Sequence, residues 1–263
     1  MRSLLLLIAV VTACARPPQR DTDAEMRRIA DDVIPLIEEA VGLTFKTAPI
    51  LAVRDRDHVY DYLVAKLDQD YPPEILERVV TAYRVFGLVS DTLDIRALLL
   101  NVLGEQVVGY YDPDSLTLYV VEGSDPFGLR FTVAHELVHA LQGQYAPLDS
   151  LLRLRSDNDR RSAAQAVLEG QATLASFMAI LSPEQLARLS NLWRDLRQDI
   201  RAQQERMPEF ATAPLVIQEE LVFPYLAGAD FMRWFESAYP DTVPFGPRMP
   251  VSTTVHPSPS EMR

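Results

Sequence analysis

The chain is poor in cysteine, histidine and basic side chains. Its 263 residues include 1 cysteine and 4 histidines, and 37 acidic residues outnumber 25 lysines and arginines, which gives a formal charge of −12. A single cysteine excludes an intramolecular disulfide, so cross-linking does not hold this fold together. The acidic balance argues against nucleic acid as a partner, because phosphate binding needs clustered lysine and arginine.

The chain also lacks an apolar run long enough to span a bilayer. Residues 4–11 are apolar and follow Arg2, a pattern typical of a secretory signal peptide. Residues 11–14, VTAC, resemble the bacterial lipobox, in which cleavage before the cysteine leaves its sulfur carrying lipid; an incidental cysteine is the alternative. We therefore expect an exported protein, anchored in the cell envelope through Cys14. In Gram-negative cells, an aspartate directly after the lipidated cysteine retains a lipoprotein in the inner membrane. The residue at that position is Ala15, so we expect the outer membrane, facing the periplasm, in a Gram-negative cell.

Helical periodicity dominates the rest of the chain, with three β-prone runs among the helices. The predicted helices cover residues 21–41, 55–67, 72–86, 93–103, 160–181 and 215–239, with a break near Pro224 in the last and a further helix starting at Ser182. The predicted strands cover residues 49–53, 106–111 and 116–122. These elements predict an α+β, mostly helical protein, divided into a signal peptide (1–13), a tether (14–23), a single domain (24–257) and a tail (258–263).

The sequence FTVAHELVHALQ at residues 131–142 contains the strongest chemical signal. On a helix, His135 and His139 share one face a turn apart, so both imidazoles can point at one metal ion. Glu136 projects about 100° away from His135, which suits a general base acting on metal-bound water rather than a ligand. Two histidines on a helix by chance are the alternative. The apolar surroundings favour the metal, because buried histidines and a carboxylate are costly unless something satisfies them.

A catalytic zinc ion usually has three protein ligands and an open fourth position. A third histidine six residues beyond His139 is excluded, because that position is Tyr145. His58 and His256 have no ligand-like neighbourhood. Glu169 is therefore the favoured third ligand of Zn²⁺, with an aspartate of residues 149–159 as the alternative.

Glu169 lies in a helical stripe of small and polar residues without lysine or arginine, which predicts burial. Gly170 beside it costs about 1 kcal/mol relative to alanine in a helix, which suggests that another backbone approaches closely there. Thr173, one turn after Glu169, could hydrogen-bond a metal ligand or its own helix backbone.

Six short runs of the sequence carry a recognisable pattern: residues 103–107 (LGEQV), 109–113 (GYYDP), 135–142 (HELVHALQ), 169–173 (EGQAT), 223–228 (FPYLAG) and 252–257 (STTVHP). Together these runs resemble a family of uncharacterised bacterial zinc metallopeptidases. The resemblance covers most of residues 30–257. It implies a zincin-like fold, with a small sheet packed on the histidine helix and a helical C-terminal part, and hydrolysis of peptide bonds in a peptide or protein substrate.

In zincins, an edge strand upstream of the metal helix accepts extended substrate by strand addition, and the predicted hairpin at residues 106–122 is placed for that role. It could equally be only part of the sheet. The tetrahedral oxyanion needs a further donor. Tyr225 and His256 are the candidates, alongside Tyr110 or Tyr111, although each could instead serve packing or capping.

Two functions remain open at this point. The first is a lipid-anchored zinc peptidase in which Glu136 is the general base. The second is a non-proteolytic envelope scaffold or assembly factor that retains a zinc site. A structural zinc site usually closes its fourth position with cysteine or histidine. The sequence near the motif offers neither, which favours the peptidase, while the oligomeric state is left open.

Overall fold

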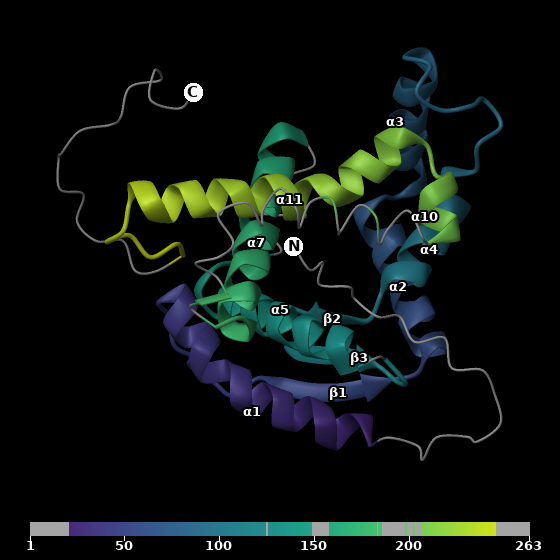
Figure 1. Cartoon of the computed structure of the whole chain (residues 1–263). Helices are drawn as coiled ribbons and strands as arrows, with labels where there is room; N and C mark the ends of the chain where they lie inside the picture. The colour runs from purple at the N-terminus through teal and green to yellow at the C-terminus, as the bar shows by residue number, and fades with distance from the viewer. Residues whose placement is uncertain are drawn as a thin grey trace, which may run out of the picture.

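The computed structural model describes residues 21–124, 126–148, 158–182, 184–185, 198, 202 and 207–245. Within them, helices predominate and three strands form one sheet, which confirms the predicted α+β, mostly helical class (Figure 1). The predicted signal peptide with Cys14, the tail, His256 and most of the helix predicted from Ser182 lie outside the described residues. No helix in the described part of the chain is both long and apolar enough to cross a membrane.

The elements follow the predicted order closely. The helices are α1 (Thr22–Val41), α2 (Arg56–Asp70), α3 (Pro73–Val85), α4 (Ile95–Gln106), α5 (Pro126–Tyr145), α7 (Asn158–Ile180), α10 (Pro208–Thr212) and α11 (Leu215–Ala238). The strands are β1 (Ile50–Arg54), β2 (Gly109–Asp112) and β3 (Thr117–Val121). The signals that set the boundaries are local: the Asp21 side chain accepts from the N–H of Ala24 at the start of α1, and Gly42 ends the helix in the left-handed region at φ 73°.

The sheet has the strand order β1-β3-β2, so β3 is central and β2 lies at an edge. β2 and β3 form the predicted antiparallel hairpin, in which Tyr110 pairs with Tyr119, while β1 runs parallel to β3. Gly109 lies so close to α5 that a Cβ atom there would come within 2.8 Å of Thr132 Cγ2. This contact places the edge strand directly beside the histidine helix.

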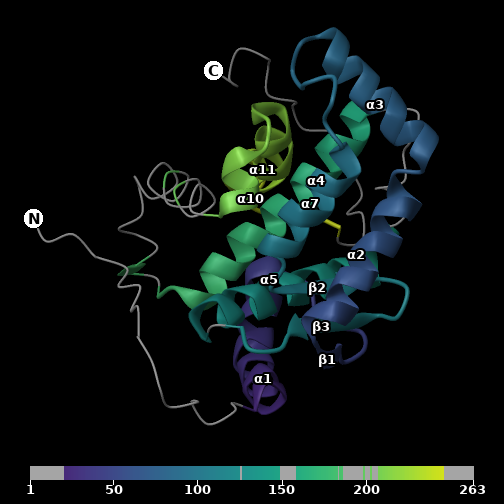
Figure 2. The ribbon, with the colours of Figure 1, turned by 90° about the vertical axis from the view of Figure 1, so that its right-hand side faces the viewer.

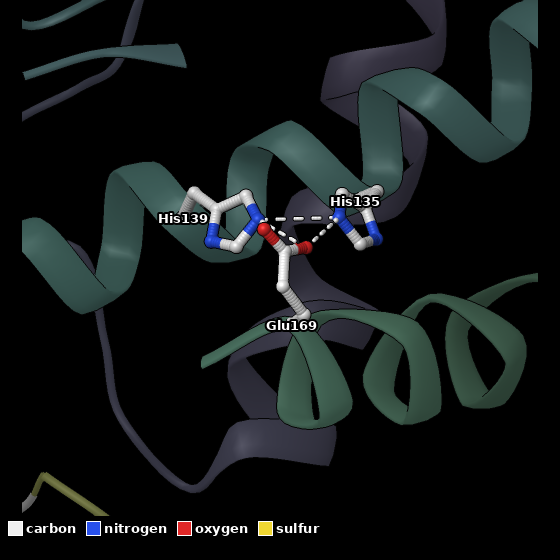
Figure 3. Close-up of side chains that lie close together, drawn as sticks. All are labelled: His135, His139 and Glu169. Atoms are coloured by element: carbon white, nitrogen blue, oxygen red, sulfur yellow. Dashed lines mark hydrogen bonds and ion pairs between the residues drawn. The ribbon is translucent and has the colours of Figure 1, made fainter. Parts of the chain in front are cut away.

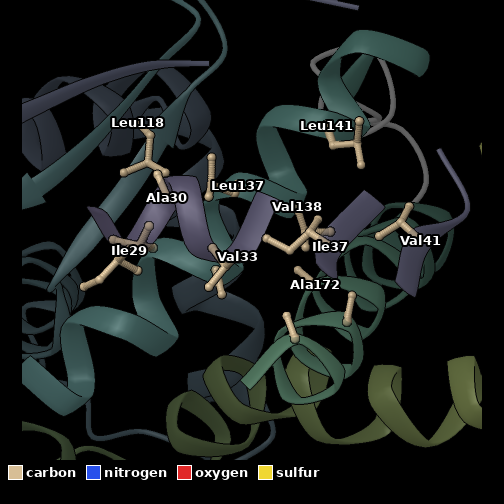
Figure 4. Packing of buried hydrophobic residues seen from close by; sticks show 14 of the residues in the cluster. Ile29, Ala30, Val33, Ile37, Val41, Leu118, Leu137, Val138, Leu141 and Ala172 are labelled. Atoms are coloured by element: carbon tan, nitrogen blue, oxygen red, sulfur yellow. The ribbon is translucent and has the colours of Figure 1, made fainter. Parts of the chain in front are cut away.

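A first hydrophobic cluster, which we call the site cluster, joins α1, β3, α5 and α7 (Figure 4). Its core residues are Met26, Ile29, Ala30, Val33, Ile37, Val41, Leu43, Leu118, Val120, Leu129, Val133, Ala134, Leu137, Val138, Leu141, Ala172, Ala175 and Ala179. The apolar face of α1 covers α5 from one side. A fully buried leucine, isoleucine or valine contributes roughly 1.5–3 kcal/mol, so this cluster fixes α5 firmly between α1, the sheet and α7.

A second cluster, which we call the helical cluster, joins α3, α4, α10 and the first half of α11. Its core residues are Leu76, Val80, Ile95, Val102, Phe210, Ala213, Ile217, Val222 and Leu226. Figures 1 and 2 show α3, α4 and α10 on one side of the molecule, away from α1. Because α11 continues from this cluster across α7, it links the two parts of the molecule.

The crossing of α7 and α11 depends on two glycines. A Cβ atom on Gly170 would lie 2.6 Å from the Cα atom of Gly228 and closer still to its carbonyl group. A Cβ atom on Gly228 would lie 3.0 Å from the Cα atom of Gly170. Neither position can hold a larger residue without moving a backbone, which confirms the close approach predicted at Gly170.

Several predicted boundaries are wrong. α2 runs to Asp70 rather than ending at Leu67. α4 does not end at Gly104 but continues to Gln106, so β2 begins only at Gly109. The last residues of α4 are held in place by a contact with α10. The Glu105 carboxylate accepts the N–H groups of Glu209 and Phe210, both at 3.1 Å, and so caps the start of α10. α11 is not broken near Pro224 but runs through it. Its buried side chains before and after the proline pack on α7 and in the helical cluster, which outweighs one missing backbone hydrogen bond.

Candidate metal centre

His135, His139 and Glu169 converge on one point between α5 and α7, and each offers one ligand atom (Figure 3). The Nε2 atom of His135 lies 3.0 Å from Glu169 Oε2, and the Nε2 atom of His139 lies 3.3 Å from the same oxygen. The two Nε2 atoms are 3.1 Å apart. Two histidines from one helix and a carboxylate from a second thus form a compact triad, as the sequence predicted.

These separations fit a shared metal ion. Donor atoms about 2.0–2.1 Å from a tetrahedral ion are separated from one another by about 3.3 Å. The three observed separations, 3.0, 3.1 and 3.3 Å, lie close to that value. The triad could therefore hold a metal ion after only a small outward shift of the side chains.

Local sequence explains why the three side chains meet. His135 and His139 are one turn apart on α5, whose remaining faces are buried in the site cluster. Glu169 precedes Gly170, so the glycine crossing with α11 fixes the part of α7 that carries the carboxylate. The Glu169 side chain is only 16% exposed and the His135 side chain 8%. Burial on this scale requires partners for the charged groups.

The triad residues shift one another's pKa values in opposite directions. Burial favours the neutral form of His139, but the Glu169 carboxylate outweighs it and raises the His139 pKa to about 9. Burial likewise opposes the charge on Glu169, but His139 and the hydrogen bonds from both imidazoles hold the Glu169 pKa well below its usual value. The carboxylate is therefore ionised and able to act as a metal ligand at neutral pH.

Glu136 points away from the triad and toward the sheet. Its Oε2 atom accepts the backbone N–H of Tyr111 in β2 at 2.8 Å. The Val121 N–H donates to the Val108 carbonyl at 2.8 Å, so Val108 bonds to β3 through its backbone. In an antiparallel pair, every second residue of a strand bonds to the partner strand and the residues between them face away from it. The backbone groups of Gly109 and Tyr111 therefore face the outer edge of β2. Glu136 lies at that edge, next to the triad but outside it.

Tyr225 is the one predicted oxyanion donor that the structure places against a triad residue. Its ring stacks on that of His135, with centroids 5.8 Å apart and an angle of 29° between the planes. The Glu169 carboxylate, together with burial and Glu136, raises the Tyr225 pKa well above its usual value. The phenol consequently keeps its proton and can donate a hydrogen bond.

Among the described residues, the candidates Tyr110 and Tyr111 are not brought to the triad, and His256 lies outside the described residues. Tyr110 stacks on Tyr62 of α2, with ring centroids 4.0 Å apart. The Tyr111 hydroxyl lies beside Gly143, about one turn beyond the second histidine on α5, although its backbone N–H donates to Glu136. His58 is held at the start of α2, where its Nδ1 atom lies 2.7 Å from Asp55 Oδ1.

Two polar residues near the triad behave differently from expectation. Gln142, to which the sequence assigned no role, is fully buried and lies 2.8 Å from the Nδ1 atom of His139. Its position three residues after His139 in an apolar helix is the signal that could have found it. Thr173 shows neither of its two predicted roles, because its buried Oγ1 atom has no hydrogen-bond partner among the described residues.

The structure thus brings together His135, His139, Glu169, Glu136 and Tyr225 from α5, α7 and α11. Compared with known proteins, the chain matched no family model, no curated protein and no solved structure. The chemical interpretation of the site therefore rests on its donor atoms, its burial and its position beside an edge strand.

Proposed function

We propose that this protein is a zinc-dependent peptidase with a zincin-like fold. One observation carries the proposal: three ligand atoms converge within 4.8 Å of one another, while the neighbouring Glu136 is directed at the edge of a strand. A carboxylate placed beside the ligands but outside them is positioned to act on metal-bound water rather than to bind the metal. A hydrolase needs that carboxylate as a base.

Zinc is the metal that best fits this set of donors. Two imidazole nitrogens and one carboxylate oxygen form the three-ligand set of many catalytic zinc sites, in which the fourth position stays open. Within the described residues, no other histidine, cysteine or acidic residue joins the group. An open fourth position distinguishes a catalytic site from a structural one and argues against a scaffold that keeps zinc only for its fold.

The side chains divide the reaction among them. When bound, zinc supplies Lewis acidity, which polarises the scissile carbonyl and lowers the pKa of a water molecule. Glu136 accepts a proton from the attacking water and delivers it to the leaving amine. The Tyr225 hydroxyl donates to the oxyanion that develops on the carbonyl oxygen. His135, His139 and Glu169 keep their positions throughout because two packed helices hold them.

The substrate class follows from the edge strand. The outward-facing carbonyl groups of Gly109 and Tyr111 and the N–H of Gly109 can pair with an extended peptide, which would then lie alongside Glu136, the residue that already accepts the Tyr111 N–H. The proposed substrate is therefore a peptide or a protein segment in extended conformation. The proposed location is the cell envelope, with the chain anchored through lipid on Cys14.

Cleavage of an unbiased peptide library by the zinc-loaded soluble domain tests this function. Wild-type protein should cleave peptides, and Glu136→Gln should lower kcat by about 10²–10⁴ while the bound zinc stays the same, because only the base is lost. Asp57→Asn, an exposed change at the start of α2, serves as the matched control and should leave cleavage unchanged. If Glu136→Gln keeps its zinc and cleaves as fast as wild type, Glu136 is not the base; if wild type binds zinc but cleaves nothing, the scaffold function takes its place.

A further inference from the structure

The residue Gln142 on α5 is the strongest unexplained feature near the triad. It is fully buried and polar, and none of the peptidase steps uses it. We propose that Gln142 is a positioning residue that holds the His139 imidazole in the orientation and tautomer required to bind the metal. This inference rests on the proposed zinc site, although not on peptide cleavage.

The orientation of the Gln142 amide follows from its partners. Its Nε2 atom lies 3.0 Å from the Leu168 carbonyl oxygen and 2.9 Å from Gln171 Oε1. A backbone carbonyl can only accept a hydrogen bond, so the NH₂ group of Gln142 must face α7. The Oε1 atom must then face His139, whose Nδ1 atom lies 2.8 Å away.

This orientation decides where His139 carries its proton. Because Gln142 Oε1 can only accept, the His139 Nδ1 atom must donate and therefore holds a hydrogen. Once the imidazole is neutral, as metal binding requires, its lone pair is therefore on Nε2, the atom that faces His135 and Glu169. Gln142 thereby turns the correct nitrogen toward the metal and prevents the ring from rotating.

The same contacts tie the two ligand-bearing helices together. Gln142 lies on α5, three residues after His139, whereas Leu168 and Gln171 lie on α7 on either side of Glu169. One side chain thus connects the second histidine to the segment that carries the carboxylate. His135 differs from His139 in this respect, because its buried Nδ1 atom has no hydrogen-bond partner among the described residues. The proposed positioning role of Gln142 therefore concerns His139 alone.

Two matched variants separate positioning from simple burial. Gln142→Met and Gln171→Met each replace one of the two glutamine side chains that hydrogen-bond to each other in the buried network. Of the two, only Gln142 contacts His139. Zinc dissociation constants, measured by competition with a chelator, should rise about 10- to 100-fold in Gln142→Met, the usual effect of losing the partner of a metal-binding histidine. Gln171→Met should stay within about threefold of wild type, since Gln142 keeps its bond to the Leu168 carbonyl. Urea unfolding of the metal-free proteins shows whether both variants lose similar stability.

Histidine ¹⁵N NMR of the zinc-loaded wild-type protein supplies a second measurement that needs no variant. His139 should bind zinc through Nε2 and carry a slowly exchanging proton on Nδ1. Binding through Nδ1, or an equal loss of zinc affinity in the two methionine variants, would overturn the positioning role. A wild-type protein that binds no zinc would overturn both this inference and the proposed function. Zinc binding without peptide cleavage would overturn only the function.

Discussion

The two hydrophobic clusters are built alike but contribute differently to the site. The site cluster surrounds α5 and part of α7, and so fixes the three proposed metal ligands and Glu136. The helical cluster contains no triad residue, and its connection to the site is α11, which carries Tyr225. Under the proposed function, metal binding would depend on the site cluster alone, whereas catalysis would depend on both clusters.

α11 connects the helical cluster to the triad. Val222 and Leu226, on either side of Tyr225, pack in the helical cluster, and Gly228 contacts Gly170 one residue beyond Glu169. The tyrosine thus lies between an apolar anchor and a close backbone crossing. Variants that separate metal affinity from turnover can test this division.

The largest effect is expected when Glu169 is removed from the metal centre. Glu169→Ala should weaken zinc binding by roughly two to four orders of magnitude, because one of three ligands carries about a third of roughly 10–16 kcal/mol. Isothermal titration or chelator competition measures the loss. Asp57→Asn, the exposed control at the start of α2, should bind zinc like wild type. Unchanged affinity in Glu169→Ala would assign the third ligand to another residue, with the aspartates of residues 149–159 next in order.

A second, smaller effect should appear in turnover alone. Tyr225→Phe removes the hydroxyl but keeps the ring that stacks on His135. It should lower kcat by about 10²–10³ while the zinc dissociation constant stays within about twofold, as expected for an oxyanion donor that does not bind the metal. Steady-state kinetics on a cleaved library peptide provides the measurement, and Tyr62→Phe serves as the control. A normal kcat in Tyr225→Phe would leave the oxyanion donor to be found elsewhere.

The smallest effect is expected from a pair of valine variants, one in each cluster, which compare the two clusters directly. Val133 and Val80 are 0% and 2% exposed, one in each cluster. Each Val→Ala change removes two methyl groups and should lower the free energy of unfolding by about 2 kcal/mol, measured in urea. Only Val133→Ala, two residues before His135, should also weaken zinc binding by a few fold. Equal zinc affinities in the two variants would show that the metal centre does not depend on its own cluster.

The grouping of His135, His139 and Glu169 could be predicted from sequence because its determinants are local. Helical periodicity places His135 and His139 on one face, and the absence of lysine and arginine around Glu169 indicated burial. Gly170 indicated a close approach of another backbone, because a glycine inside a helix otherwise only lowers the stability of the helix. The structure places these residues together as the pattern predicted.

The features that the sequence did not predict depend on distant contacts. Pro224 usually ends a helix, and only packing on both sides of it shows why α11 continues. Gly104 lies within α4 because Glu105 caps a helix more than a hundred residues away. The role of Gln142 likewise depends on the Leu168 carbonyl, whose place opposite α5 follows from helix packing rather than from periodicity.

The most direct test of the account is the zinc content of the purified wild-type protein, measured by elemental mass spectrometry after dialysis at neutral pH. Three converging ligands predict close to one zinc ion per chain, retained against buffer without metal. Less than about half an ion per chain would contradict a zinc centre at His135, His139 and Glu169, since three-ligand sites bind zinc tightly.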